Sequence, residues 1–464
     1  MTRTELLVVG AGPGGLCAAI EASRAGVDVT VVDDNLQPGG QIFRQLPPPF
    51  QIKEPKALGT DFRRGKELLA EALSSNIHFR FGCTAWGLFD PNVMEVVSGS
   101  ERDRIRADRI VLATGAYDRP VPVPGWTLPG VFTIGGAQSL LKSQRILVGR
   151  RVIMAGLGPL LLVVTGQLHK AGVEIVAVAE PVSFHRVIPY LPALLREWSI
   201  TRDGLRYRWS LAKDRVPWLA RSMLVRVEGD QHVERGVIAK VDRDWRPIEG
   251  TERSFEVDAV CIGYGLLPSV ELPRICGCEL RFAPEIRSWL PLRDPNMETT
   301  VAGVFVVGDC AGIAGAVVAA EEGRIAGITV ARQLNRLTDE EAERRITLHR
   351  VRCQQLKRFR RAFDRAYVLR RGLYELATPE TIICRCEEVV LRELQESFDD
   401  GARSANNLKA WSRAGMGPCQ GRMCSAFTTE WLARTCNCTI EEVGLTTPRL
   451  PAKPIVPLRS LAGN

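Results

Sequence analysis

The sequence predicts an α/β protein with two nucleotide-binding βαβ units, joined to a small α-helical domain near the C-terminal end. Three observations support this prediction. A pattern of strand, glycine turn, helix and strand occupies residues 5–32 and returns at residues 152–179. Six of the 13 cysteines fall between Cys384 and Cys438. A chain of 464 residues exceeds one ordinary hydrophobic core, so two or three domains are expected.

The first βαβ unit begins with an apolar strand over Glu5–Val9. A turn at Gly10–Gly15 leads into a helix over Leu16–Ala25, and a second strand covers Val27–Val32. The whole unit has the length of about 30 residues that a βαβ unit needs. This is the Rossmann-like arrangement, in which a glycine turn between strand and helix can receive a dinucleotide.

The turn carries the pattern Gly10-x-Gly12-x-x-Gly15. The first glycine permits a tight turn, the second lets the backbone approach a pyrophosphate, and the third allows close helix–strand packing. The helix N-terminus offers free N–H groups and a partial positive charge to the phosphates. An acid at the end of the next strand can accept hydrogen bonds from the adenosine ribose. The residues predicted to contact the dinucleotide here are Gly10, Gly12, Pro13, Gly14, Gly15, Asp33 and Asp34.

Two later segments indicate that the bound dinucleotide is FAD and not NAD. The run Ile110-Val-Leu-Ala-Thr114-Gly115 and the pair Gly308-Asp309, which ends an apolar stretch from Gly303, resemble signatures of glutathione-reductase-like flavoproteins with two dinucleotide-binding domains. The resemblance covers roughly residues 1–335. It implies that Thr114 and Gly115 lie near the adenylate, and that Asp309 binds the ribityl or pyrophosphate part of FAD. It also implies that Gly39-Gly40-Gln41 approaches the flavin.

The second βαβ unit has a damaged glycine pattern. Its predicted elements are a strand over Val152–Ala155, a turn at Gly156–Gly158, a helix over Leu160–Ala171 and a strand over Val173–Ala179. Leu161 stands at the third glycine position and Pro159 removes a backbone donor, but Glu180 could still hold an adenosine ribose. Either the site binds NAD(P)H despite the substitution, or it is a relict that holds an adenine nucleotide or nothing. The damage favours the relict.

No side chains with the spacing of a catalytic site occur in these domains. There is no Cys-x2-Cys or Cys-x4-Cys pair here, which argues against disulfide-reductase chemistry, and Cys276-x-Cys278 is predicted to be structural. The five histidines form no triad, and His185 is predicted to lie on the surface or to be packed. We therefore predict no catalytic residues in this chain.

The C-terminal cysteines are spaced as two pairs, Cys384-x-Cys386 and Cys419-x4-Cys424. The segment between them has a helical pattern that would bring the pairs together as a helix-turn-helix. Glycines around the second pair can offer N–H groups to a cluster. Four thiolates suit a 2Fe-2S cluster or zinc. The predicted flavin favours the cluster, because a cluster can carry electrons to or from it. Cys436 and Cys438 are either spare or alternative ligands.

This module resembles the bacterioferritin-associated-ferredoxin-like 2Fe-2S domain, although that family usually has Cys-x2-Cys as its second pair. Longer motifs indicate a subfamily: Ala116-Tyr-Asp-Arg-Pro120, Pro124–Val131, Gly158-Pro-Leu-Leu-Leu162 and Cys419-Gln-Gly-Arg-Met-Cys424. They resemble the FAD-containing α subunits of opine oxidases, hydrogen cyanide synthase and D-hydroxyproline dehydrogenase. The resemblance spans nearly the whole chain.

The subfamily implies an oxidoreductase that acts on CH-NH or CH-NH2 donors as part of a complex. A glycine- or sarcosine-oxidase-like FAD β subunit would oxidise the amine, and this chain would relay electrons through FAD and the 2Fe-2S cluster. A small ferredoxin-like subunit often completes such complexes. Two alternatives are a self-contained NAD(P)H-dependent FAD/iron–sulfur oxidoreductase and an assembly scaffold with a structural flavin. The substrate, the terminal acceptor, the stoichiometry and any interface flavin are not readable from the sequence.

Composition and charge fit a folded cytoplasmic protein, with 45% hydrophobic and 25% charged residues. Apolar runs such as Leu160–Val164 are far shorter than the roughly 18 residues of a membrane helix, so contact with the inner membrane would come only through the electron acceptor. Residues 344–371 hold eleven Lys or Arg and one acid, Asp364. Because no aromatic-rich module accompanies them, we expect a basic helix against an acidic partner or solvent, and no nucleic acid.

The predicted domain organisation follows these landmarks. Residues 1–118 and 266–335 form the FAD-binding domain, and residues 119–265 form an inserted, degenerate NAD-binding-like domain. Residues 336–378 form a basic helical linker and residues 379–440 the 2Fe-2S domain. Residues 441–464 form a tail with prolines at a spacing of three, which is typical of extended polyproline geometry. Such a tail is expected to be disordered or to wrap a neighbouring subunit.

Overall fold

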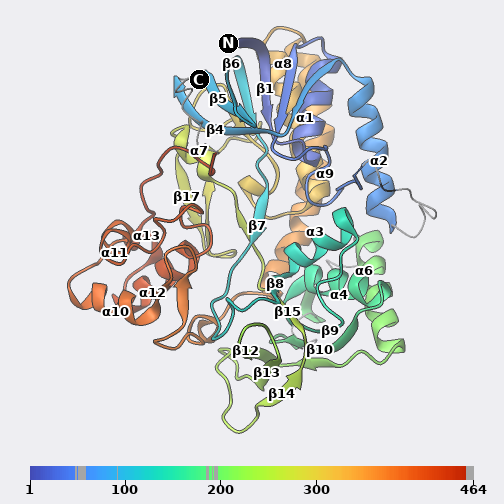
Figure 1. The fold of residues 1–464 in the computed structure, drawn as a ribbon. Helices are drawn as coiled ribbons and strands as arrows, with labels where there is room; N and C mark the ends of the chain where they lie inside the picture. The colour runs from blue at the N-terminus through green and yellow to red at the C-terminus, as the bar shows by residue number, and fades with distance from the viewer. Residues whose placement is uncertain are drawn as a thin grey trace, which may run out of the picture.

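The computed structural model describes residues 1–47, 50, 59–90, 92–183, 188–190, 192 and 197–455. It is a mixed α/β fold in which two mainly parallel sheets and a helical C-terminal module lie beside one another (Figure 1). Because both faces of the parallel sheets are covered, their strands are nearly continuous runs of Val, Ile, Leu and Ala.

The first sheet has seven strands in the order β3-β2-β1-β6-β5-β4, with β19 paired to the end of β6. The strands β1, β2, β3, β6 and β19 are parallel, and β4 and β5 form an antiparallel extension. The strands are β1 (Thr2–Val9), β2 (Val29–Asp33), β3 (Ile77–Phe81), β4 (Cys83–Asp90), β5 (Val93–Ser98), β6 (Glu101–Leu112) and β19 (Val304–Val306). The helices of this body are α1 (Pro13–Arg24), α2 (Gly59–Ser74), α8 (Ala316–Gln333) and α9 (Asp339–Ala366).

The second sheet has five parallel strands in the order β11-β10-β9-β15-β8. An antiparallel sheet of three strands, which the sequence analysis did not predict, lies beside it. The strands are β8 (Val131–Thr133), β9 (Arg151–Gly156), β10 (Glu174–Glu180), β11 (Trp218–Ala220), β12 (Ser222–Glu228), β13 (Arg235–Lys240), β14 (Arg253–Glu256) and β15 (Ala259–Gly263). The helices are α3 (Ile134–Gln144), α4 (Gly158–Lys170) and α6 (Trp198–Lys213).

The chain passes between the two bodies through an antiparallel pair of short strands, β7 (Ala116–Asp118) and β16 (Leu266–Pro268). After β16 it forms α7 (Glu271–Ile275) and the hairpin of β17 (Leu280–Ala283) and β18 (Ser288–Pro291). Helix α8 begins only at Ala316, because Gly312 and Gly315 adopt positive φ angles that interrupt helical geometry.

The C-terminal module contains β20 (Ile382–Cys384), β21 (Val389–Val390), α10 (Leu391–Asp399), α11 (Ala405–Ser412), α12 (Ser425–Thr435) and α13 (Ile440–Val443). The predicted helix-turn-helix corresponds to α10 and α11. The two-stranded sheet of β20 and β21 was not predicted, and it places Cys384 at the end of a strand.

The basic segment forms α9, which runs along both parallel bodies in Figure 1. Part of its charge is neutralised within the chain. Lys357 pairs with Glu322 at 2.7 Å, Arg345 with Glu21 at 2.6 Å, and Arg352 with Glu197 at 2.7 Å. These three side chains therefore face acids of the same chain, which corrects for them the expectation of an acidic partner or solvent.

The described part of the tail corrects the expectation of disorder or of a neighbouring subunit. It runs from the C-terminal module back to β4 of the same chain, where the N–H of Ala452 donates to the carbonyl of Trp86 at 2.7 Å. Lys453 forms an ion pair with Asp34, and Ala452 is buried. These contacts hold the segment despite its prolines. Across the described ranges, none of the helices combines the length and apolarity needed to cross a membrane.

Candidate flavin and cysteine sites

The glycine turn after β1 is closed too tightly for any side chain at its third glycine. A Cβ on Gly15 would lie 1.9 Å from the carbonyl oxygen of Gly10 and 3.1 Å from Val8 Cγ1. Pro13 and Gly14 form the first turn of α1, where the missing N–H of proline is tolerated. The helix therefore starts against the end of β1 with its free N–H groups at the edge of the sheet.

Asp33 ends β2 beside this turn. Its carboxylate accepts hydrogen bonds from the N–H of Ala11 at 2.6 Å and from the N–H of Asn35 at 2.7 Å. Burial raises the pKa of Asp33, and the two N–H donors lower it. The neighbouring Asp34 is partly exposed and pairs with Lys453 of the tail, so the two predicted acids lie in different surroundings.

The predicted GGQ segment folds against the glycine turn. A Cβ on Gly40 would lie 2.9 Å from the Cα of Gly12, so the two backbones touch. The Gln41 amide oxygen accepts a hydrogen bond from Arg44 at 2.9 Å and one from Ser139 of α3 at 3.3 Å. Gln41 thus lies where the first body meets the second.

Asp309 lies in a short 3-10 turn (Gly308–Ala311) that follows β19, next to the same sheet edge. Its carboxylate accepts hydrogen bonds from the N–H groups of Ala314 and Gly315, at 3.1 and 3.0 Å, and burial raises its pKa. Glu322 of α8 holds the turn by accepting a hydrogen bond from the N–H of Gly308 at 2.9 Å.

Thr114 and Gly115 follow β6 and lie next to Cys310 of that turn. The Thr114 hydroxyl donates to the carbonyl of Ser269 at 2.8 Å, and the N–H of Ser269 donates to the carbonyl of Gly115 at 2.9 Å. Apart from the side chains of Asp34 and Gln41, which face neighbouring elements, the predicted FAD contacts therefore gather along one edge of the first sheet. A glycine-lined backbone turn flanked by the buried Asp33 and the partly buried Asp309 suits a dinucleotide.

In the second body the acid that could hold a ribose is engaged by the chain itself. The Glu180 carboxylate accepts hydrogen bonds from Trp218 Nε1 at 3.0 Å and from the N–H of Gly158. The Arg208 guanidinium lies 4.2 Å from the centroid of the Trp218 ring. Leu161 is fully buried among core side chains. His185 lies outside the described residues.

The four predicted ligand cysteines come together as two contacting pairs, Cys384 with Cys424 and Cys386 with Cys419. A hydrogen bond from the Cys424 thiol lowers the pKa of Cys384 to about 5, although burial acts in the opposite direction. The same contact raises the pKa of Cys424, and burial raises that of Cys386. All four thiols are free.

The segment over residues 415–424, which we call the cysteine loop, wraps closely around these sulfurs. The N–H of Gly415 donates to Cys384 Sγ at 3.4 Å. A Cβ on Gly417 would lie 2.3 Å from the Cβ of Cys386, so only glycine fits there. Within the described ranges, no three or more His, Cys, Asp or Glu side chains are arranged to hold one metal ion. Two thiol pairs with a backbone donor suit a two-iron cluster better than tetrahedral zinc.

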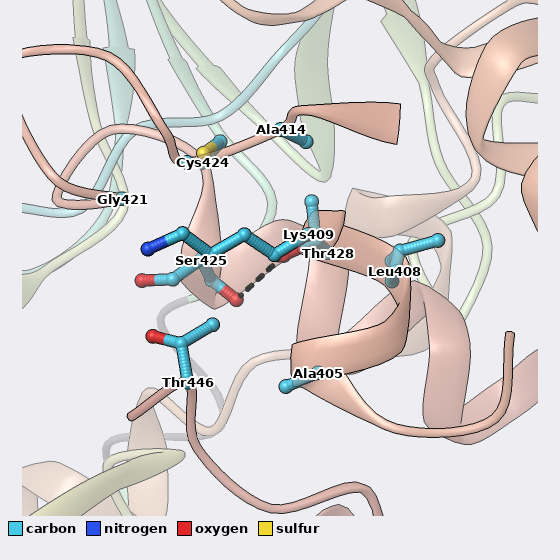
Figure 2. Close-up of a pocket in the computed structure, with 10 residues that line it drawn as sticks. Ala405, Leu408, Lys409, Ala414, Gly421, Cys424, Ser425, Thr428 and Thr446 are labelled. Atoms are coloured by element: carbon cyan, nitrogen blue, oxygen red, sulfur yellow. Dashed lines mark hydrogen bonds between the residues drawn. The ribbon is translucent and has the colours of Figure 1, made fainter. Parts of the chain in front are cut away.

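A small hollow lies beside Cys424, between α11, α12 and the tail (Figure 2). The Thr428 hydroxyl donates to the carbonyl of Ser425 at 3.2 Å on its wall. Its volume of about 10 Å³ has room for about one water molecule, so it is not a ligand site. Cys436 and Cys438 lie beside each other at the end of α12, and Cys276 and Cys278 are buried near β4.

Sequence reasoning missed the acids that support these sites. Glu322 is buried and pairs with Arg293 at 2.6 Å, and Glu271 of α7 pairs with Arg422 of the cysteine loop at 3.0 Å. Arg422 lies between the predicted ligands Cys419 and Cys424 in the sequence, and this position could have marked it as a residue that supports the site. The pattern around Glu271 and Glu322 did not mark either acid.

Comparisons with known proteins agree with this arrangement. A family model described as pyridine nucleotide-disulphide oxidoreductase matches residues 4–323, and one described as sarcosine oxidase A3 domain matches residues 378–464. The A subunit of opine oxidase from Agrobacterium tumefaciens is 36% identical, over 97% of this chain and 90% of its own. Hydrogen cyanide synthase subunit HcnB of Pseudomonas aeruginosa is 32% identical, over 97% of this chain and 96% of its own.

Among solved structures, L-proline dehydrogenase from P. horikoshii shares the fold with a TM-score of 0.70 at 21% identity, covering 98% of this chain and 78% of that one. The fold and the sheet-edge site define an FAD-dependent oxidoreductase of the pyridine nucleotide-disulphide oxidoreductase class. Within that class, the chain belongs to the family that contains hydrogen cyanide synthase subunit HcnB and the opine oxidase relative.

Proposed function

We propose that this chain is the electron-transferring α subunit of a heteromeric FAD-dependent amine or amino-acid dehydrogenase, with an opine, a hydroxyproline or a similar secondary amine as the substrate. The observation that carries the proposal is the fusion of a four-cysteine module to an FAD-binding fold, in a chain similar along its whole length to subunits of two oxidoreductases. A glycine- or sarcosine-oxidase-like β subunit would oxidise the C–N bond.

The residues at the edge of the first sheet would hold FAD. The turn at Gly10–Gly15 and the start of α1 would bind the pyrophosphate through backbone N–H groups. Asp33 would accept hydrogen bonds from the ribose, and Asp309 would bind the ribityl or pyrophosphate part of FAD. Cys384, Cys386, Cys419 and Cys424 would hold the 2Fe-2S cluster, with the Gly415 N–H directed at a sulfur. The flavin would supply the electron-accepting chemistry, and the cluster would supply one-electron transfer.

We propose that the domains of this chain have the boundaries predicted from the sequence, with the inserted domain at residues 119–265. The β7–β16 pair supports the crossings near residues 118 and 266, because both passages between the bodies occur there. We further propose that the second nucleotide fold holds no dinucleotide, since Leu161 stands at the third glycine position and Pro159 removes a backbone donor. The Glu180 carboxylate is also bonded to Trp218 and Gly158. A cytoplasmic location and a small ferredoxin-like subunit complete the proposal. Free thiols at all 13 cysteines fit that compartment.

An anaerobic titration of the purified chain with NADH and NADPH tests the relay. We expect neither nucleotide to bleach the flavin band, and we expect bleaching once the amine and the β subunit are added. Rapid bleaching by a nucleotide alone would make the chain a self-contained reductase and would contradict the proposal.

Iron and sulfide content tests the ligands. Cys419→Ser is expected to lose the cluster absorbance and to retain the flavin, whereas Cys438→Ser, in the same module, is expected to retain both. Loss of iron from Cys438→Ser with retention in Cys419→Ser would overturn the ligand assignment. Stoichiometric zinc in place of iron would overturn the cluster itself.

A further inference from the structure

Arg422 ties the cysteine loop to two other parts of the chain. Its Nη1 donates to the carbonyl of Cys419 at 3.2 Å, and its Nη2 donates to the carbonyl of Ala452 in the tail. Its Nε lies 3.0 Å from a carboxylate oxygen of Glu271 in α7. The side chains of Arg422 and Glu271 are only 16% and 17% exposed. An ion pair that is this well shielded is screened less than a surface pair.

Glu271 in turn contacts the segment that leads to the predicted FAD site. Its second carboxylate oxygen accepts a hydrogen bond from the Ser269 hydroxyl at 2.9 Å. The backbone of Ser269 is bonded to Thr114 and Gly115, at 2.8 and 2.9 Å. A continuous series of polar contacts therefore leads from the predicted FAD signature to the carbonyl of Cys419.

We propose that Arg422 and Glu271 are positioning residues, which fix the cysteine loop against the flavin-binding fold and set the charge beside the cluster. The proposal rests on the proposed ligation of a 2Fe-2S cluster by Cys419. Two features distinguish this pair from an ordinary contact between domains: one partner bonds the backbone of a proposed ligand, and the other bonds the segment that follows the FAD signature.

The Tyr117 phenol lies beside the same pair and adds no charge there. Burial raises the pKa of Tyr117, and the negative charge of Glu271 raises it further. The phenol is therefore protonated at neutral pH. The ion pair itself contributes one guanidinium and one carboxylate, with the Arg422 guanidinium next to Cys419, and the Arg274 guanidinium also faces Glu271.

The two charges predict shifts of opposite sign. Reduction adds one electron to the cluster, so a nearby positive charge stabilises the reduced form and a nearby negative charge destabilises it. Arg422→Gln should therefore lower the midpoint potential, and Glu271→Gln should raise it. We expect changes of up to tenfold in the equilibrium constant for reduction, which corresponds to about 59 mV for one electron.

The experiment uses the full chain as purified, with four variants: Arg422→Gln, Glu271→Gln, Arg422→Lys and the control Arg287→Gln. Arg287 is a matched control because it pairs with Glu430 of α12 and so also joins the C-terminal module to the rest of the chain. A redox titration followed by electron paramagnetic resonance gives the cluster potential. Hydrogen–deuterium exchange of residues 415–424 reports on the cysteine loop whether or not the cluster is loaded.

We expect opposite potential shifts in Arg422→Gln and Glu271→Gln, faster exchange in the loop of both, and partial recovery in Arg422→Lys. The control should leave the potential and the loop exchange unchanged. Wild-type exchange in Arg422→Gln, or potential shifts of the same sign in the two Gln variants, would overturn the proposal. If the wild-type chain lacks iron and sulfide, the cluster assignment fails. Hydrogen–deuterium exchange of residues 415–424 alone then decides whether Arg422 and Glu271 fix the cysteine loop.

Discussion

Glu180 ends β10 with its carboxylate enclosed by the second nucleotide fold. Burial raises its pKa to about 7, against an ordinary value of 4.5, while the hydrogen bond from Trp218 opposes the shift. The unfolded chain therefore ionises this group at a lower pH than the folded chain does. Its contribution to stability is fully present below about pH 4.5 and is lost as the pH rises to about 7.

Glu180→Gln should remove this pH dependence, because the amide oxygen can still accept from Trp218 and cannot ionise. Each pKa unit corresponds to about 1.4 kcal/mol, so we expect the variant to gain up to about 3 kcal/mol over wild type at pH 8 and little at pH 5. Denaturant unfolding at both pH values measures the difference. Glu174→Gln, at the exposed start of the same strand, is the control and should show no such trend. A stability difference that does not change with pH would contradict the assignment.

Spacing along the chain predicts individual site residues where one short segment supplies several of them. The turn at Gly10–Gly15 and the Cys419–Cys424 loop are of this kind, since the chemistry needs each residue within a few positions. Glu271 and Glu322 could not be predicted in this way. Their partners, Arg422 and Arg293, are brought to them by the tertiary fold, and an isolated glutamate in a helix has no distinguishing pattern.

At the scale of elements, the contact between α1 and α8 supports the edge of the first sheet where FAD is predicted to bind. A Cβ on Gly323 would lie 2.0 Å from the carbonyl oxygen of Gly14, and a Cβ on Gly327 would lie 2.3 Å from that of Ala18. The two helices therefore touch backbone to backbone, with glycines four residues apart on one face of α8. Since α1 carries the glycine turn at its start, this contact fixes where the turn lies.

Gly327→Ala should separate the helices despite the higher helix propensity of alanine. We expect a loss of about 1–3 kcal/mol in the free energy of unfolding, together with a lower flavin content. The control is Gly204→Ala, because Gly204 also lies inside a helix, α6, and a Cβ there would meet nothing within 4 Å. That variant should gain about 0.5–1 kcal/mol. Equal effects in the two variants would show that the α1–α8 contact is not tight.

Helices and strands that a clear local sequence pattern marks were predicted. Short strands without such a pattern were not. The strands and helices of both βαβ units lie within a few residues of the predicted ranges, because continuous apolar runs and glycine turns mark them locally. The strands β12, β13 and β14 were missed because β12 and β13 are short apolar runs, which periodicity alone does not separate from a buried helix segment, and β14 is mostly polar. The strands β20 and β21 were missed because they are only three and two residues long.

At the scale of the whole molecule, the sequence predicted two βαβ bodies and a helical C-terminal module, but not how that module is held. The described tail supplies part of the answer. It leaves α13, passes Arg274 and Arg422, which donate to its carbonyls, and reaches the first sheet at Trp86. The proline spacing indicated only an extended segment. The attachment depends on arginines of α7 and of the cysteine loop, which no local pattern connects to the tail.

A chain that ends after Val443 should therefore keep its flavin and cluster but hold the C-terminal module more loosely. The cysteines lie before the cut, whereas the contacts of Ala452 and Lys453 lie after it. Losing about 1–2 kcal/mol of local stability would raise the transiently opened fraction roughly 5- to 30-fold, and limited proteolysis at native pH measures that rise. A chain that ends after Ile455 retains every one of these contacts and is the control. Equal cleavage rates in the two truncated chains would mean that Arg287–Glu430 and Arg422–Glu271 hold the module without the tail.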